Sequence, residues 1–83
     1  MKNVVIIDSV RTAIGKLGGT LGNETVDFLG AKVIGELNAR TGLEKSSVEE
    51  VIMGQAKQSA DVSNLARVAA LRAGLPEEVP AYT

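Results

Sequence analysis

The sequence predicts an α/β fold in which short apolar strands alternate with helices. Two apolar runs, at residues 4–7 and 51–56, are too short to form helices. Each run is followed by a segment with helical character, and a third apolar run begins at Val79. Because this alternation is typical of sheets covered by helices, we expect a β-α-β-α-β portion of a mixed, mainly parallel sheet.

The first apolar run is expected to be the central strand. It consists of four consecutive β-branched residues between Asn3 and Asp8. An uninterrupted apolar run predicts a strand that is buried on both faces, as in a parallel sheet. Residues 15–23 contain four glycines and predict a loop with positive φ angles.

The first helix is expected to follow Thr25. Apolar residues recur at three- to four-residue spacing over residues 26–37, with charged residues opposite them. Thr25 is a suitable N-cap, Asp27 suits the positive end of the helix dipole, and Gly42 suits a left-handed stop. Two Ser-x-x-Glu patterns within residues 46–50 then predict a capped turn.

The second half predicts a strand, a helix and the start of a third strand. Gly54 within the strand at residues 51–56 indicates a bulge or a close backbone approach. Asn64 is expected to cap a helix over residues 65–73 that ends at Gly74, with alanines on one face that allow another backbone to approach. The sequence ends within the strand that begins at Val79. We therefore expect a fragment whose unpaired strand pairs with another chain.

Composition excludes most catalytic chemistry within these 83 residues. The chain has no cysteine and no histidine, which removes thiolate nucleophiles, disulfides and the commonest metal ligands. A net charge of −1, without runs of one sign, disfavours nucleic acid and anionic membranes as partners. No apolar stretch has the length of a membrane span or an export signal, so a cytoplasmic location is expected.

The glycine-rich loop at residues 15–19 raises the question of phosphate binding. It matches neither the P-loop pattern nor the dinucleotide-binding pattern, and it lies several residues before the helix. A structural loop is therefore the favoured interpretation.

The remaining polar candidates favour structural roles. Asp8 and Arg11, at the expected carboxyl end of the first strand, are interpreted as an ion pair that shapes the turn, and Glu49 and Glu50 as solvated charges. For Gln58, Asn64 and Arg67 we also favour structure, with Asn64 capping its helix and Arg67 bonding loop carbonyls or a neighbouring chain. We expect no catalytic and no metal-binding residue in this chain, and the sequence leaves cofactor-binding residues unknown.

Four stretches, in order, resemble the thiolase family. Residues 4–19 are similar to its entry strand and Arg-Thr-Pro-Ile-Gly loop, although Ala13 replaces the proline. Residues 26–31, Val-Asp-Phe-Leu-Gly-Ala, resemble its Val-Asp-Leu-Gly-Ala helix start, and residues 51–54 its second strand. Residues 64–67, 73–76 and 79–81 resemble its Asn-Pro-Ala-Arg, Ala-Gly-Leu-Pro and Val-Pro-Ala segments, with Leu65 in place of the first proline.

The resemblance implies that residues 1–83 are an incomplete N-terminal thiolase domain. Such enzymes are acetyl-CoA acetyltransferases or 3-ketoacyl-CoA thiolases, in which a cysteine takes up an acyl group and passes it to CoA or acetyl-CoA. That cysteine would follow Thr83, so the fragment itself is expected to be inactive. The resemblance also implies CoA thioesters as substrates of the parent enzyme, no other cofactor, and a homodimer or homotetramer. The alternative is a small non-catalytic α/β binding or interaction module.

Overall fold

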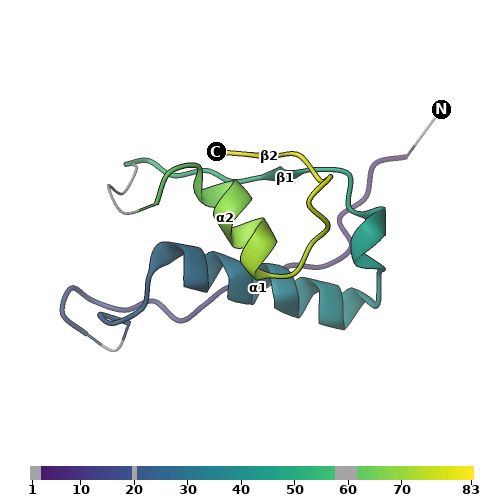
Figure 1. Cartoon of the computed structure of the whole chain (residues 1–83). Coiled ribbons are helices and arrows are strands. Elements are labelled where there is room, and N and C mark those ends of the chain that lie inside the picture. Colours follow the sequence, from purple (N-terminus) through teal and green to yellow (C-terminus); the bar gives the residue numbers. More distant parts are fainter. Residues whose placement is uncertain (1–2, 20, 58–61) are drawn as a thin grey trace.

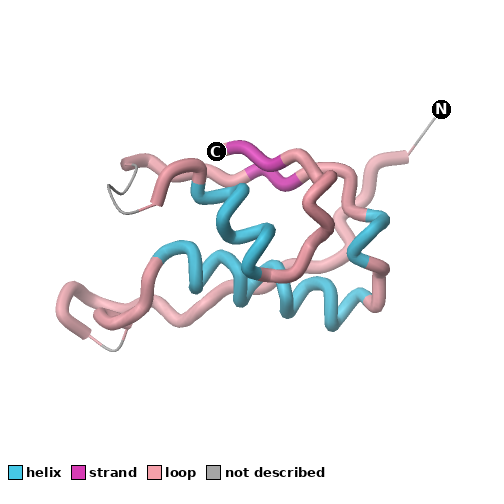
Figure 2. Tube along the Cα trace, in the orientation of Figure 1, coloured by secondary structure: helices cyan, strands magenta, loops and turns pink. Residues whose placement is uncertain are grey.

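The fold combines two α-helices with a small parallel sheet, as the sequence predicts. The computed structural model describes residues 3–19, 21–57 and 62–83. The elements follow one another as α1 (Val26–Thr41), the 3-10 helix η1 (Lys45–Ser47), β1 (Val51–Ile52), α2 (Leu65–Arg72) and β2 (Ala81–Tyr82). In Figures 1 and 2 the sheet lies on one side, α2 packs beneath it, and α1 lies on the far side of α2.

β1 and β2 form a parallel two-stranded sheet that is connected through α2. Val51 pairs with Ala81 and Ile52 pairs with Tyr82. The Val51 amide donates to the Pro80 carbonyl at 2.9 Å, and the Met53 amide donates to the Tyr82 carbonyl at 3.1 Å. This β1-α2-β2 unit confirms the parallel arrangement expected from the alternation of strands and helices.

The ends of α1 lie where the sequence predicts them. Thr25 is the N-cap residue, but its side chain makes no cap hydrogen bond. At the other end Gly42 adopts φ 68° and its amide donates to the Asn38 carbonyl. Because this left-handed conformation disfavours residues with a Cβ atom, Gly42 is a local stop signal that the sequence reveals without tertiary information.

The small hydrophobic core is centred on α2. The buried apolar residues are Leu65, Ala66, Ala69, Ala70, Leu75 and Val79. Half of them are alanines, which confirms that this helix uses small side chains to approach its neighbours. At the contact with α1, a Cβ atom placed on Gly30 would lie 3.1 Å from the Ala69 Cβ atom and 3.3 Å from the Met53 Cε atom.

The prediction of a buried central strand at residues 4–7 is wrong for this structure. These residues form no strand, and their side chains are largely exposed, with 97% for Val4 and 92% for Ile6. A strand requires a neighbour for its backbone groups. In the described part of the chain the backbone of residues 4–7 makes no hydrogen bond to β1 or β2, so this β-branched segment remains unpaired.

Two smaller expectations are also corrected. The Ser-x-x-Glu patterns do not form capping boxes, because η1 begins one turn earlier and the Ser47 hydroxyl donates to the Glu44 carbonyl at 2.6 Å. Gly54 lies beyond the end of β1, and among the described residues no atom would come within 4 Å of a Cβ atom placed on it. The turn before β1 is therefore real, but its capping differs from the prediction.

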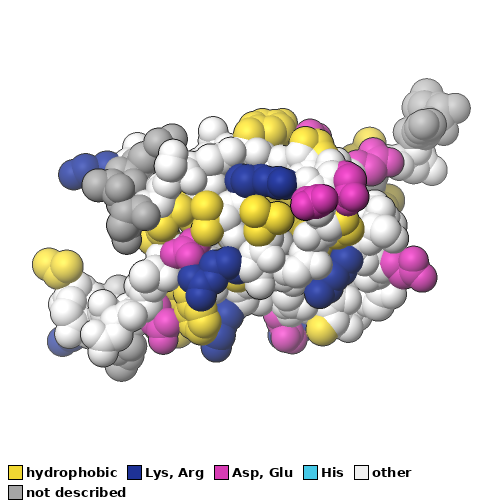
Figure 3. Space-filling model, viewed as in Figure 1, with side chains coloured by type: hydrophobic (Ala, Val, Ile, Leu, Met, Phe, Trp, Pro, Cys, Tyr) yellow, Lys and Arg dark blue, Asp and Glu magenta, His cyan; other side chains and the backbone are white. Residues whose placement is uncertain are grey.

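The visible surface mixes charged and apolar side chains without a large area of one charge (Figure 3). Ile52 and Tyr82, which are paired across the sheet, are 61% and 50% exposed. Within residues 3–19, 21–57 and 62–83, no helix combines the length and apolar character needed to cross a bilayer.

Substitution of two glycines in α1 tests the close contact between the helices. Gly35 has open space around it, so Gly35→Ala should stabilise the chain by about 1 kcal/mol through helix propensity. Gly30→Ala should lose most or all of that gain, because the new methyl group overlaps the Ala69 side chain on α2. Urea unfolding followed by circular dichroism measures both changes, and equal gains would contradict the proposed contact.

Candidate functional site

The main polar cluster lies where the carboxyl end of β2 meets the start of α2. Asn64, the N-cap residue of α2, has φ 47°, and its side-chain oxygen accepts from the Arg67 amide at 3.4 Å. Its side-chain nitrogen donates to the Ala81 carbonyl at 3.2 Å. Asn64 therefore caps the helix, as predicted, and also holds the neighbouring strand.

Thr83 completes this connection. Its hydroxyl donates to the Asn64 side-chain oxygen at 3.1 Å and accepts from the Ala66 amide at 3.1 Å. One hydroxyl thus satisfies a free amide of the first turn of α2 and fixes the residue that follows β2. Sequence analysis missed this role, since nothing in the local sequence signals a cap from 17 residues away.

Arg67 holds the loop that leads into β2. Its guanidinium donates to the Val79 and Glu77 carbonyls, each at 2.9 Å. The planar fork of arginine suits two carbonyl acceptors at once. The expectation that Arg67 bonds loop carbonyls is confirmed, and these bonds direct the chain from α2 back to the sheet.

An ion pair with a half-exposed arginine and a largely buried aspartate connects the two helices. Arg72 donates to the Asp27 carboxylate at 2.5 Å, and the Asp27 side chain is 11% exposed. The hydrogen bond from Arg72, followed by one with Thr25, lowers the pKa of Asp27, although burial acts in the opposite direction. Sequence analysis assigned Asp27 only to the helix dipole, because its partner lies 45 residues away.

The ring of Phe28 is contacted by two cations, Lys32 and the Arg72 of this ion pair. The Lys32 ammonium is 5.2 Å from the ring centroid, and the central carbon of the Arg72 guanidinium is 5.6 Å from it. Both distances are within the range of cation–π attraction. Arg72 thus contacts α1 through a carboxylate and an aromatic ring, which explains how a half-exposed arginine contributes to helix packing.

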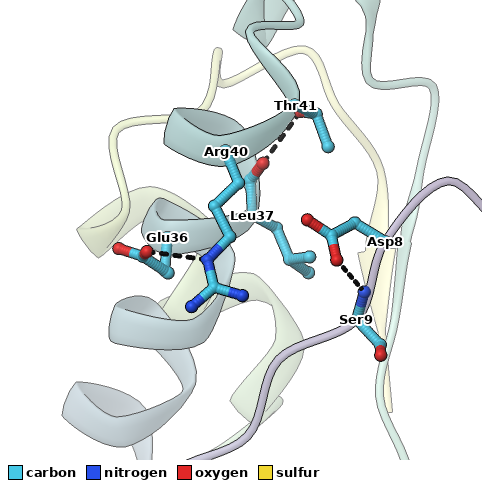
Figure 4. A network of polar contacts seen from close by, with 6 residues as sticks. All are labelled: Asp8, Ser9, Glu36, Leu37, Arg40 and Thr41. Atoms are coloured by element: carbon cyan, nitrogen blue, oxygen red, sulfur yellow. Dashed lines mark hydrogen bonds and ion pairs between the residues drawn. The ribbon is translucent and has the colours of Figure 1, made fainter.

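The predicted ion pair between Asp8 and Arg11 does not form. Asp8 accepts from the Ser9 amide at 2.8 Å, and the Arg11 guanidinium donates to the Thr12 carbonyl at 3.1 Å. Figure 4 shows Asp8 and Ser9 beside the carboxyl-terminal part of α1, where Arg40 bonds Glu36 at 2.9 Å. Without a strand at residues 4–7, the turn that would bring the two charges together is absent.

A cavity of about 530 Å³ separates residues 10–12 from α1. Its walls include apolar groups such as Leu29 and Val33 and charges of both signs, including the bonded Glu36 and Arg40. In the part of the chain that the structure describes, no three acidic residues gather as metal ligands.

The other sequence candidates have structural or surface positions. Glu49 and Glu50 are exposed, as expected for solvated charges. Within the glycine-rich loop, Gly18 has φ 73° and the Gly19 amide donates to the Lys16 carbonyl at 2.8 Å. This bond closes a turn well before α1, in agreement with the structural interpretation of the loop. Gln58 lies outside the described residues.

Comparison with known proteins identifies the family. The family described as "Thiolase, N-terminal domain" matches residues 4–83. The chain belongs to the thiolase family.

Several acetyl-CoA acetyltransferases are similar to this thiolase chain over its whole length. The enzyme of Cupriavidus necator is 47% identical and that of Pseudomonas aeruginosa 46% identical over 83 residues. The crystal structure of the Bacillus anthracis acetyl-CoA acetyltransferase has a TM-score of 0.84 and 45% identity over 90% of this chain and 19% of its own length. The chain spans 21% of the length of the two curated relatives.

Removal of one hydroxyl tests the connection between β2 and α2. Thr83→Val should destabilise the chain by about 1 kcal/mol, because it leaves the Ala66 amide and the Asn64 oxygen with one partner fewer. Thr12→Val is the matched control, since the Thr12 hydroxyl bonds only the adjacent, exposed Ala13 carbonyl. Equal changes in the urea midpoint for the two variants would contradict the capping role.

The lowered pKa of Asp27 makes the contribution of the ion pair depend on pH. An aspartate whose pKa is lowered by folding stabilises the folded state above the unfolded pKa, near 3.9, and this stabilisation disappears as the pH falls through the folded pKa. Asp27→Asn should therefore destabilise the chain at neutral pH and have a smaller effect in acid.

The exposed pair of Glu36 and Arg40 provides the control for this pH dependence. Both side chains are 53% exposed, so Glu36→Gln should change the free energy of unfolding by about 0.5 kcal/mol or less. Urea unfolding of both variants from neutral to acidic pH measures the difference. A loss for Asp27→Asn that does not depend on pH would contradict the role assigned to its charge.

Proposed function

We propose that this chain is the first, incomplete part of the N-terminal domain of an acetyl-CoA acetyltransferase. The observation that supports this most directly is the similarity of all 83 residues to acetyl-CoA acetyltransferases at 46–47% identity. The proposed enzyme transfers an acyl group between a cysteine acyl-enzyme and CoA or acetyl-CoA. CoA thioesters are its proposed substrates, and no further cofactor is proposed.

The proposed contribution of the 83 residues is structural. They contain neither cysteine nor histidine, and the polar groups of Asn64, Arg67 and Thr83 are engaged in holding β2 against α2. A nucleophile and a general base would have to come from other parts of the enzyme. We therefore propose no catalytic and no metal-binding residue within residues 1–83.

The remainder of a thiolase chain is the proposed partner of this segment. The apolar residues at positions 4–7 support the proposal, because their side chains are 67% to 97% exposed and they form no strand with the described part of the chain. We further propose a cytoplasmic homodimer or homotetramer that binds neither nucleic acid nor membrane. The near-neutral charge supports the exclusion of nucleic acid.

A second class, a small non-catalytic binding module, is favoured by one observation. The chain forms its own small hydrophobic core, in which Ala66 and Ala69 are fully buried. A monomer that resists proteolysis without any partner would support this alternative.

Cleavage of acetoacetyl-CoA by CoA tests the proposed function. The 83-residue chain alone should show no turnover, whereas a protein that contains it together with the remaining thiolase sequence should be active. Alkylation with iodoacetamide should abolish that activity, because the proposed nucleophile is a cysteine thiolate. Activity of the isolated chain, or an inactive longer protein, would contradict the proposal. The intact mass of the protein from its source shows whether it exists as the 83-residue chain or as the longer protein.

A further inference from the structure

The cavity beside α1 has a size that suits a small ligand. Its volume of about 530 Å³ lies within the range of small-molecule sites, roughly 300 to 1,000 Å³. Its lining comes from residues 10–12, from α1 and from Leu21 in the turn before α1. The glycine-rich loop packs closely on this leucine, since a Cβ atom placed on Gly15 would lie 3.2 Å from the Leu21 Cγ atom. The cavity is therefore built from several segments of the chain and not from the surface of one helix.

Part of the lining is apolar. On α1 it consists of Phe28, Leu29 and Val33, whose spacing places them on one face of the helix. Val10 and Leu21 add apolar surface from the other segments. All five residues are half-buried, so an apolar ligand in the cavity would remove more of their surface from water.

The charges of the lining do not all neutralise one another. Glu36 and Arg40 bond each other at 2.9 Å and are already paired. Within residues 3–19, 21–57 and 62–83, Arg11 and Lys32 form no ion pair, and neither does Glu24. The cavity thus offers two free cations against one free carboxylate, an excess that attracts an anion.

Both free cations have donors available for a carboxylate. The Arg11 guanidinium donates to the Thr12 carbonyl at 3.1 Å, which leaves its other N–H groups available. The Lys32 ammonium lies 5.2 Å from the centroid of the Phe28 ring, beside the apolar part of the lining. We propose that the cavity binds an amphipathic carboxylate, with its charged head at Arg11 and Lys32 and its apolar chain against the apolar face of α1.

This inference does not depend on the proposed acyl transfer. It uses only groups within residues 10–40, and its test measures binding, whereas the test of acyl transfer measures turnover. Either proposal can therefore fail while the other stands.

Three ligands with the same apolar chain test the proposal. Octanoate carries the carboxylate, octanol has no charge, and octyltrimethylammonium carries the opposite charge. We expect octanoate to bind the 83-residue chain with a dissociation constant on the order of 1 mM, and about fivefold more tightly than octanol. In titrations followed by NMR, the amide signals of the residues that line the cavity should shift, while those of the exposed residues 4–7 should not.

Two pairs of variants test the charged and the apolar parts of the site. Lys32→Gln should weaken octanoate about fivefold and leave octanol unchanged, and Lys57→Gln, at an exposed lysine outside the lining, is its control. Val33→Phe fills part of the cavity and should weaken both ligands. Ala39→Phe, at an exposed position of α1 outside the lining, should weaken neither. Circular dichroism shows whether Val33→Phe is folded, and if it is not, the lysine pair decides.

Four results would each overturn the proposal. These are the absence of saturable octanoate binding, octyltrimethylammonium binding as tightly as octanoate, signal shifts centred on residues 4–7, and equal effects of Lys32→Gln and Lys57→Gln. The same titration of a longer protein that contains the remaining thiolase sequence should also show binding. Binding by the 83-residue chain alone would mean that other parts of the enzyme occupy the cavity, and it would likewise overturn the proposal.

Discussion

The close contact between α1 and α2 is the constraint on which the rest of the structure depends. Gly30 and Ala69 face each other at a distance that leaves almost no room for one further methyl group. This contact brings the two helices together, and α2 in turn contacts both strands. Since half of the buried apolar residues are alanines, the stability of the core depends strongly on close packing between its elements.

Polar groups then determine how the second half of the chain returns to the sheet. Arg67 holds the loop before β2, while Asn64 and Thr83 connect the start of α2 to the residues at the end of β2. These bonds cross between the helix and the strand that follow each other in the chain. They define the position of the carboxyl end of β2, which is the edge where open α/β sheets commonly place ligands.

The local elements were largely predictable from the sequence, but their partners were not. Gly42 ends α1 through its own backbone conformation, and Asn64 caps α2 through its own side chain. Because both effects are local, the end of α1 and the start of α2 were predicted correctly. Asp27 and Thr83 act through partners 45 and 17 residues away, which no local pattern reveals. The failure at residues 4–7 has the same origin, because an apolar run predicts a strand only when a neighbouring strand is available.

The sequence by itself determined the alternation of strands and helices, the absence of cysteine and histidine, and the motifs that resemble thiolases. These properties follow from residue identity and spacing alone. Only the tertiary structure decided which strands pair, that α2 lies between the sheet and α1, and that the Asn64 side chain bonds the Ala81 carbonyl of β2. The physical reason is that pairing and packing satisfy groups far apart in the sequence, and each group selects its partner only after the chain has folded.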